Sequence, residues 1–197
     1  MKAKAAPPAD RRKPILYVTL AVIVIGLIVA VGYLSRNPSI VPQAATEAHP
    51  QAQLKVGDTA PQFAVSTTAG PFDLANSTTP VFLEVFATWC PHCQHEVPIL
   101  DGLNTKYGKR VQFVGVSGSA LGIDGNVPES QADVINFVGK FGVTYPVAYD
   151  PDLTVAKQYL STGFPTIVVI GKDKKVKAIL DGEIPQAQLE KAIQDVL

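Results

Sequence analysis

The sequence of 197 residues has only two cysteines and three histidines, and it has no excess of charge of either sign. Seventeen Lys and Arg residues balance seventeen Asp and Glu residues, so the overall charge does not indicate a nucleic-acid partner. No internal repeat and no glycine motif of the phosphate-binding type is present. The length leaves room for one domain of ordinary size plus an appendage.

The N-terminal third contains the one long hydrophobic run. Residues 15–34 read ILYVTLAVIVIGLIVAVGYL, and residues 1–14 before them carry five basic side chains against Asp10 alone. About 20 apolar residues suffice to cross a bilayer core of roughly 30 Å, and basic residues mark the cytoplasmic side. The pattern predicts a cytoplasmic basic tail over 1–14 and one transmembrane anchor over 15–34. The protein would then be a single-pass cell-membrane protein with its remaining residues outside the cytoplasm.

Other kinds of leader fit this segment less well. The run is longer than the roughly 15 residues of a signal peptide core, and it is followed by Ser35-Arg36-Asn37-Pro38 and not by a small-x-small cleavage site. No cysteine lies near it for lipid attachment. Residues 35–55 are rich in Pro, Ala and Gln without an apolar period, which predicts a flexible tether. The globular domain is expected over 56–197.

Both cysteines lie in the stretch Trp89-Cys90-Pro91-His92-Cys93, directly after the apolar run 81–86. A Cys-x-x-Cys between a strand and a helix places the first sulfur beside free backbone N–H groups and the second sulfur one turn deeper. A helix N-terminus stabilises the thiolate, which is the nucleophile in disulfide exchange. The motif therefore predicts a redox-active dithiol that needs no cofactor. Cys90 is expected to be the exposed attacking thiol and Cys93 the shielded resolving thiol.

Three other uses of the cysteine pair are less well supported. A structural disulfide across so short a loop constrains the unfolded chain little, and a tetrahedral zinc site needs two more ligands. Covalent haem attachment requires a histidine where Gln94 stands. A dithiol that holds a soft metal such as Cu(I) remains as an alternative to redox chemistry.

Hydrophobic periodicity predicts an α/β sandwich with a mixed central sheet. Strands are expected at 81–86, 111–116, 166–170 and 176–180, with 145–149 as a short strand or sheet edge. Helices are expected from the cysteines to Gly108, at 130–141, at 150–159 and at the C-terminus.

The strand at 81–86 carries apolar residues on both faces, which is typical of a central strand. Glu84 is its one charged residue. A carboxyl group in such a strand loses hydration, so its pKa should rise, and we interpret Glu84 as a proton relay for Cys93. The alternative is a strand residue that reaches solvent at a sheet edge.

From about residue 56 onward the sequence resembles the thioredoxin superfamily, and within it the membrane-anchored TlpA/ResA-like thiol–disulfide oxidoreductases. The resemblance rests on four features, which are Gly57-Asp58-Thr59-Ala60-Pro61, Phe86 to Cys93, Pro98, and Gly163-Phe164-Pro165-Thr166. It implies a thioredoxin-like fold in which Pro165 is a cis-proline that faces the dithiol. Gly163 and Phe164 would then lie on the surface that meets a substrate.

The same resemblance assigns roles around the cysteines. Glu84 would match the acid that thioredoxins bury beneath the second cysteine, and Trp89 and Pro91 would tune the dithiol. Glu96, three residues after Cys93, would face the dithiol as a similarly placed acid does in ResA-like proteins. It could equally be a first-turn acid that only complements the helix dipole.

The sequence departs from the anchored reductases in two places, which are the dipeptide Pro91-His92 and Phe164, a residue bulkier than the Val or Thr common before the cis-proline. The dipeptide Pro91-His92 resembles that of DsbA, a strong oxidant, and an imidazolium at His92 would stabilise the Cys90 thiolate and make the disulfide more oxidising. Peroxiredoxins place a threonine three residues before the attacking cysteine, where this chain has Ala87, which argues against a peroxidase.

The favoured hypothesis is an extracytoplasmic oxidoreductase that reduces disulfides of exported proteins, for example in cytochrome c maturation. Its partners would be protein disulfides or dithiols together with a membrane redox protein, and no nucleic acid is expected. An oxidant that forms disulfides is the main alternative, followed by a soft-metal module and a peroxidase. The direction of electron flow depends on the reduction potential, which the sequence does not give.

Overall fold

The computed structural model describes residues 22–27 and 53–197. Residues 22–27 are helical and belong to a different unit from the domain that follows. The predicted tail 1–14 lies outside the described residues, as do most of the predicted anchor 15–34 and most of the tether 35–55. Within the described part of the chain, no helix has both the length and the apolar character that crossing a membrane requires.

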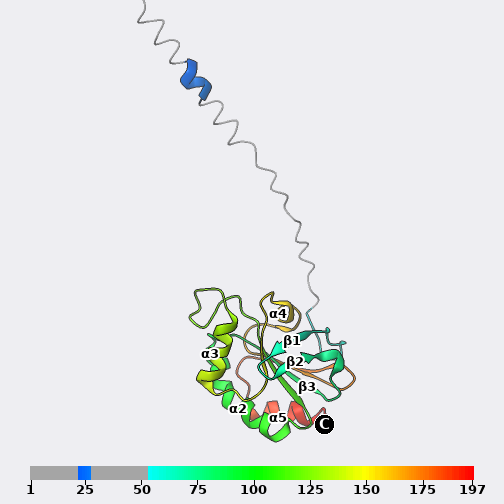
Figure 1. The fold of residues 1–197 in the computed structure, drawn as a ribbon. Coiled ribbons are helices and arrows are strands. Elements are labelled where there is room, and N and C mark those ends of the chain that lie inside the picture. Colours follow the sequence, from blue (N-terminus) through cyan, green and yellow to red (C-terminus); the bar gives the residue numbers. More distant parts are fainter. Residues whose placement is uncertain (1–21, 28–52) are drawn as a thin grey trace, which may run out of the picture. The chain divides into compact units, whose positions relative to one another are not determined.

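Seven strands form a single mixed sheet in the order β2-β1-β5-β4-β3-β6-β7 (Figure 1). β3 pairs parallel with β4 and antiparallel with β6, so the predicted mixed sheet is confirmed and β3 is central. β5 is not an edge strand, because it lies between β1 and β4. The strands are β1 Ala64–Thr67, β2 Gly70–Asp73, β3 Val81–Phe86, β4 Gln112–Ser117, β5 Val147–Tyr149, β6 Thr166–Ile170 and β7 Val176–Asp181.

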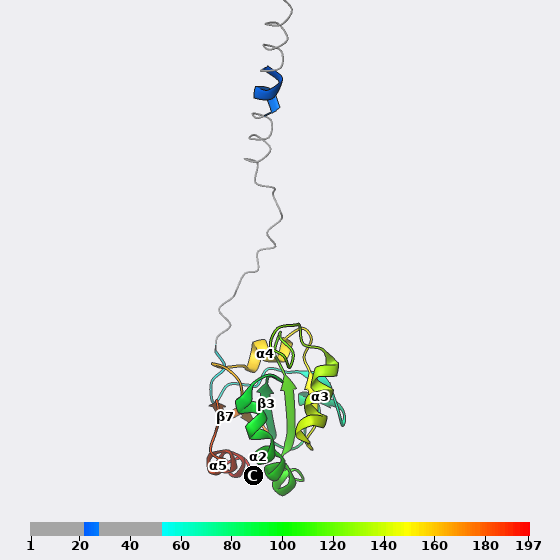
Figure 2. The ribbon, with the colours of Figure 1, turned by 90° about the vertical axis from the view of Figure 1, so that its left-hand side faces the viewer.

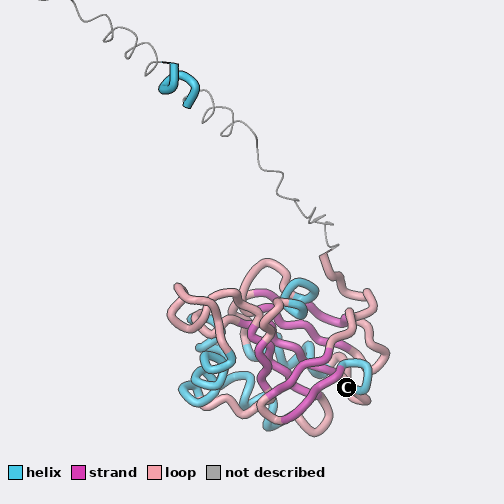
Figure 3. The backbone as a smooth tube through the Cα atoms, turned by 45° about the horizontal axis from the view of Figure 1, so that its top comes forward, coloured by secondary structure: helices cyan, strands magenta, loops and turns pink. Residues whose placement is uncertain are grey.

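The strands of the sheet run through the middle of the domain, with helices around them (Figure 3). One hydrophobic core joins the sheet to α2, α3 and α5. The second core, on the other face, joins it to α4 and to residues 60–74. Figure 2 shows α2 beside β3. The helices are α2 Pro91–Tyr107, α3 Gln131–Phe141, α4 Thr154–Tyr159 and α5 Gln186–Gln194, with a short 3-10 turn at Leu74–Asn76.

The side chains of β3 alternate between the two cores, as the sequence predicted. Val81, Leu83 and Val85 belong to the core beneath α4, whereas Phe82 and Phe86 belong to the core beneath α2. Because side chains along a strand point to opposite faces in turn, Glu84 shares the face of the two phenylalanines. Its carboxyl group is therefore directed toward the helix that carries the cysteines.

Local capping fixes where the helices begin. Cys90 is the N-cap of α2 and Pro91 is its first residue, a position where proline removes no helical hydrogen bond. The helix predicted over 150–159 begins only at Thr154, because the carboxylate of Asp150 accepts the N–H groups of Thr154, Val155 and Ala156 at 2.8, 2.8 and 3.0 Å. Asp150 thus lies before the N-cap residue Leu153 and satisfies the first N–H groups of α4 with its carboxylate.

Candidate active site

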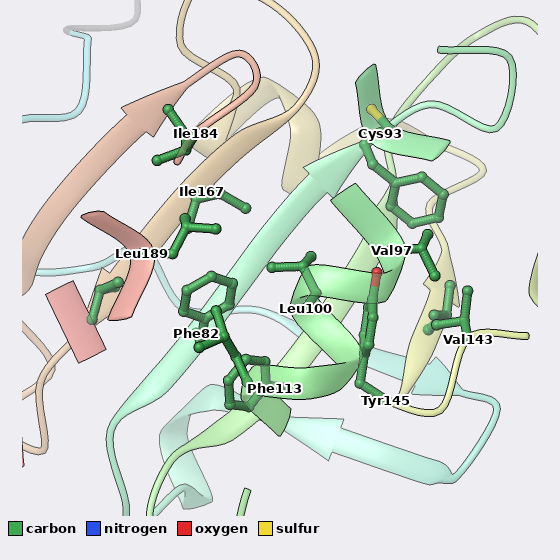
Figure 4. Close-up of a cluster of buried hydrophobic side chains, with 14 of the residues drawn as sticks. Phe82, Cys93, Val97, Leu100, Phe113, Val143, Tyr145, Ile167, Ile184 and Leu189 are labelled. Carbon is green, nitrogen blue, oxygen red and sulfur yellow. The ribbon is translucent and has the colours of Figure 1, made fainter. Parts of the chain in front are cut away.

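The two cysteines lie where β3 ends and α2 begins, and both are free thiols. Cys93 is fully buried on the inner face of α2, above Val97 and Leu100 (Figure 4). The expectation of an exposed Cys90 is wrong, because only 4% of the residue is accessible to solvent. Its Sγ lies 3.6 Å from the carbonyl oxygen of Phe164, in the segment that packs against it.

The Phe164–Pro165 peptide bond is cis, as the resemblance implied. The Phe164 ring meets the indole of Trp89 edge to face, with ring centroids 6.0 Å apart and planes at 89°. Gly163 is partly exposed, and its carbonyl oxygen accepts the Thr166 hydroxyl at 2.8 Å. The cis-proline loop and the turn that carries Cys90 are therefore held against each other by the sulfur contact and by the aromatic pair.

The environment of Cys93 disfavours the thiolate form of its side chain. Burial raises the pKa of its thiol well above the ordinary value, and the nearby Glu84 carboxyl raises it further. A group that stays protonated in this way cannot attack a mixed disulfide until a base removes its proton. The predicted role of Cys93 as the resolving thiol therefore requires a proton acceptor close to its sulfur.

Glu84 is buried in the central strand, so the alternative of a solvent-exposed edge residue is wrong. Burial, with a smaller contribution from Glu96, raises the pKa of Glu84 to about 8, although the hydrogen bond from Tyr145 opposes this rise. The Tyr145 hydroxyl donates to Oε2 of Glu84 at 2.8 Å, and Figure 4 shows that Tyr145 projects toward α2. The predicted rise is confirmed, and the acid can exchange a proton near neutral pH.

A glycine on the neighbouring strand leaves space for the Glu84 carboxyl and the Tyr145 ring. Gly115 of β4 stands opposite Glu84 in the parallel register. A Cβ atom at this position would lie 3.0 Å from Cε2 of Tyr145 and 3.5 Å from Oε2 of Glu84. A side chain at residue 115 would therefore press on the tyrosine that holds the acid.

Glu96 is fully buried on α2, five residues beyond the first helical residue Pro91. The alternative of a first-turn acid is therefore wrong. Within the described residues neither carboxyl oxygen makes a hydrogen bond of normal geometry. Burial raises the pKa of Glu96 to about 7, while the backbone N–H of Ile184 opposes the rise and the Glu183 carboxylate adds to it.

The His92 side chain lies at the surface of the domain. Its Nδ1 lies 2.8 Å from Oε2 of Glu183, in the turn after β7, and both side chains are more than half exposed. A carboxylate beside the imidazole would offset part of the charge that the ring could present to the dithiol. Sequence inspection gave no sign of this partner.

Inspection of the sequence also did not identify three further polar residues at the site. Tyr145 holds Glu84, Ser119 accepts the indole N–H of Trp89 at 2.8 Å, and Glu129 accepts the hydroxyl of Thr88 at 2.9 Å. None lies in a recognisable motif. Ser119 and Glu129 come from the loop of residues 118–129, which lies between β4 and α3.

Comparison with known proteins relates the domain to the Redoxin family and to ResA thiol-disulfide oxidoreductases. The family model Redoxin matches residues 55–196. A thiol-disulfide oxidoreductase ResA from Bacillus anthracis is 34% identical over 142 residues, which is 70% of this chain and 76% of that protein. ResA from Bacillus subtilis is 29% identical over 181 residues, or 91% and 92% of the two chains.

Solved structures show the same architecture. A Chlorobium tepidum protein assigned as the thiol:disulfide interchange protein DsbE is 28% identical and superposes with a TM-score of 0.63, over 73% of this chain and 98% of that one. The expected thioredoxin-like α/β fold is therefore confirmed for the described domain.

Proposed function

We propose that this chain, which belongs to the Redoxin family and is a thiol–disulfide oxidoreductase, uses the Cys90–Cys93 dithiol to reduce disulfides of exported proteins at the outer face of the cell membrane. The basic tail 1–14 and the apolar run 15–34 support this location. The observation that carries the proposal is the geometry of the dithiol, with Cys90 at the helix entrance and Cys93 buried near the Glu84 carboxyl.

The first step is attack by the Cys90 thiolate on one sulfur of the substrate disulfide. A bond forms between Cys90 and that sulfur while the substrate S–S bond breaks, and the departing thiolate takes a proton from solvent. Helix α2 begins at residue 91, so its free N–H groups stabilise negative charge on Cys90. The product is a mixed disulfide between enzyme and substrate.

The second step releases the reduced substrate. Cys93 gives its proton to the Glu84 carboxylate, and its sulfur attacks Sγ of Cys90 to form the Cys90–Cys93 disulfide. The second substrate sulfur leaves as a thiolate and is protonated by solvent. Two electrons have then passed from the enzyme to the substrate. A dithiol of a membrane redox partner would restore the reduced enzyme through the same exchange in reverse.

The pKa of Glu84 sets the pH dependence of the second step. Only the ionised carboxylate can accept the proton, and its fraction grows about tenfold per pH unit below the pKa of about 8. The rate of resolution should therefore rise with pH and level off near pH 8. Glu96, with a pKa of about 7, is the second buried acid close enough to act on Glu84 through its charge.

An oxidant role is the second candidate, and His92 is the observation that favours it. A cation between the two cysteines would stabilise the reduced form and make the disulfide a stronger oxidant. The Glu183 carboxylate, 2.8 Å from the ring, works against this effect, and for that reason we favour the reductase.

Exported c-type apocytochromes, whose haem sites carry paired cysteines, are one class of substrate for the reductase.

The reduction potential of the Cys90–Cys93 pair tests this choice. A value close to the −270 mV or so of thioredoxin supports a reductase, whereas a value near the −120 mV or so of DsbA contradicts it. Turnover of insulin disulfides should be lost in Cys90→Ser. Cys93→Ser should instead accumulate a mixed disulfide that non-reducing electrophoresis detects, and trapping through residue 93 in Cys90→Ser would reverse the assigned roles.

A further inference from the structure

Glu129 is a buried acid that the steps above do not use. It stands at the end of the loop 118–129, directly before Ser130, the N-cap of α3, and only 6% of it is accessible to solvent. Its Oε1 accepts two hydroxyl groups, from Thr88 at 2.9 Å and from Ser117 at 2.8 Å. Its Oε2 is buried and makes no hydrogen bond within the described residues.

The contact with Thr88 reaches the residues immediately before the nucleophile. Thr88 is fully buried, and its carbonyl oxygen accepts the side-chain amide of Gln94 at 2.9 Å, so both its side chain and its backbone are held. The next residue, Trp89, donates its indole N–H to Ser119. Two consecutive residues before Cys90 are therefore attached to the loop 118–129 by side-chain hydrogen bonds.

Glu129 is itself fixed from several directions. Ser117 is the last residue of β4, and the hydroxyl of Tyr149, at the end of β5, donates to the backbone oxygen of Glu129 at 2.7 Å. The acid thus connects the ends of two strands and the start of α3 with the turn that carries the dithiol.

A contribution to stability does not explain why an acid is buried at residue 129. Burial raises the pKa of Glu129, and only the Ser117 and Thr88 hydroxyls and the Thr88 backbone amide oppose the rise appreciably. A buried polar atom without a partner costs free energy, and an apolar side chain of similar size is often as stable in such a place. An acid retained there at this cost is better explained by what it holds in place.

We propose that Glu129 is a positioning residue for the nucleophile: through Thr88 it fixes the turn that sets Cys90 against the cis-proline loop. Exchange requires the attacking sulfur to meet the substrate disulfide in a defined direction, so a looser turn lowers the rate without removing any reacting group. This inference rests on the proposed role of Cys90 as the attacking thiol.

Two variants that each delete one hydroxyl bonded to the same oxygen provide a matched test. Thr88→Val removes the bond to the turn, and Ser117→Ala removes the bond to β4 while the turn stays attached. We expect Thr88→Val to lower the single-turnover rate of mixed-disulfide formation on the order of tenfold, less than the roughly hundredfold effect of a 1 Å misplacement. Ser117→Ala should change this rate less than about twofold, although both variants lose a hydrogen bond.

A second pair separates positioning from folding. Glu129→Gln keeps an oxygen that accepts both hydroxyls and should retain most of the rate, whereas Glu129→Ala should behave like Thr88→Val. Trp89 is the only tryptophan of the chain, so its fluorescence reports on the turn directly. Emission should shift in Thr88→Val and Glu129→Ala while far-ultraviolet circular dichroism stays unchanged.

Equal rates in Thr88→Val and Ser117→Ala, with both proteins folded, would overturn the proposal and leave Glu129 a purely structural residue. The same conclusion follows if folded Glu129→Ala reacts at the wild-type rate. Cys90→Ser is measured alongside to keep the two hypotheses apart. Activity that survives in Cys90→Ser would refute the proposed function itself and not the role of Glu129.

Discussion

Glu84→Gln separates the energetic penalty of a buried acid from its use in catalysis. Glutamine has nearly the same size, and its carbonyl oxygen can still accept the Tyr145 hydroxyl that donates to Glu84 at 2.8 Å. What the substitution removes is the ionisable proton. The fold should therefore become more stable at neutral pH while the exchange reaction becomes slower.

The magnitude follows from the pKa of Glu84, which burial raises from 4.5 to about 8. Below pH 4.5 the carboxyl is protonated in both the folded and the unfolded chain. Between pH 4.5 and 8 the unfolded chain ionises while the native protein keeps the proton, so stability falls by about 1.4 kcal/mol per pH unit. The loss reaches about 3 kcal/mol at pH 7 and about 5 kcal/mol above pH 8.

Urea unfolding of the reduced proteins at several pH values measures this difference. The free energy of unfolding of Glu84→Gln should exceed that of the wild type by about 3 kcal/mol at pH 7, and the two values should converge near pH 4. Glu190→Gln is a control in which the change in stability should have the opposite sign. Lys106 and Tyr107 lower the pKa of Glu190, so its ionised form stabilises the fold above about pH 4.5, and the substitution removes that stability. If the difference between Glu84→Gln and wild type were the same at pH 4 and pH 8, the linkage argument would be refuted.

The kinetic half of the prediction uses the same variant. Resolution of the mixed disulfide should lose the rise that levels off near pH 8, since the variant lacks the group that we propose accepts the Cys93 proton. An unchanged pH profile in Glu84→Gln would remove the relay role even if the stability prediction held.

Three other substitutions give expected outcomes from single contacts. Tyr145→Phe removes a hydrogen bond that lowers the pKa of Glu84, so the midpoint of the kinetic pH profile should move upward. Gly115→Ala brings a methyl group to 3.0 Å from the tyrosine ring and should destabilise the domain by about 1–3 kcal/mol in urea unfolding, and wild-type stability would show that the ring can move aside. Glu183→Gln removes the carboxylate 2.8 Å from His92 and should make the reduction potential less negative, whereas an unchanged potential would deny both residues a tuning role.

Local pattern was enough to predict most of the elements. The apolar residues on both faces of 81–86 correctly indicated a central strand, because such a strand must satisfy two cores at once. The start of α4 was placed too early, because the sequence does not show that the Asp150 carboxylate accepts the first three N–H groups of the helix from outside it. Cys90 was expected to be exposed because the motif does not show which loop packs against its sulfur.

The supporting polar residues of the site were not predictable from spacing. Tyr145 lies 61 positions from Glu84, Glu129 lies 41 positions from Thr88, and Glu183 lies 91 positions from His92. Each contact exists only because the sheet order brings the segments together. A tyrosine or glutamate in a loop carries no local sign of such a contact.

Three buried acids, Glu84, Glu96 and Glu129, have raised pKa values. Glu84 and Glu96 interact through their charges, so ionisation of one makes ionisation of the other harder. Their protons should then leave in two steps that belong to the pair and not to either residue. A kinetic pH profile of the wild type would report these shared steps, and Glu96→Gln should leave a single step at lower pH for Glu84. The order in which the two acids ionise therefore has to be assigned from the single variants, because the wild-type curve contains both.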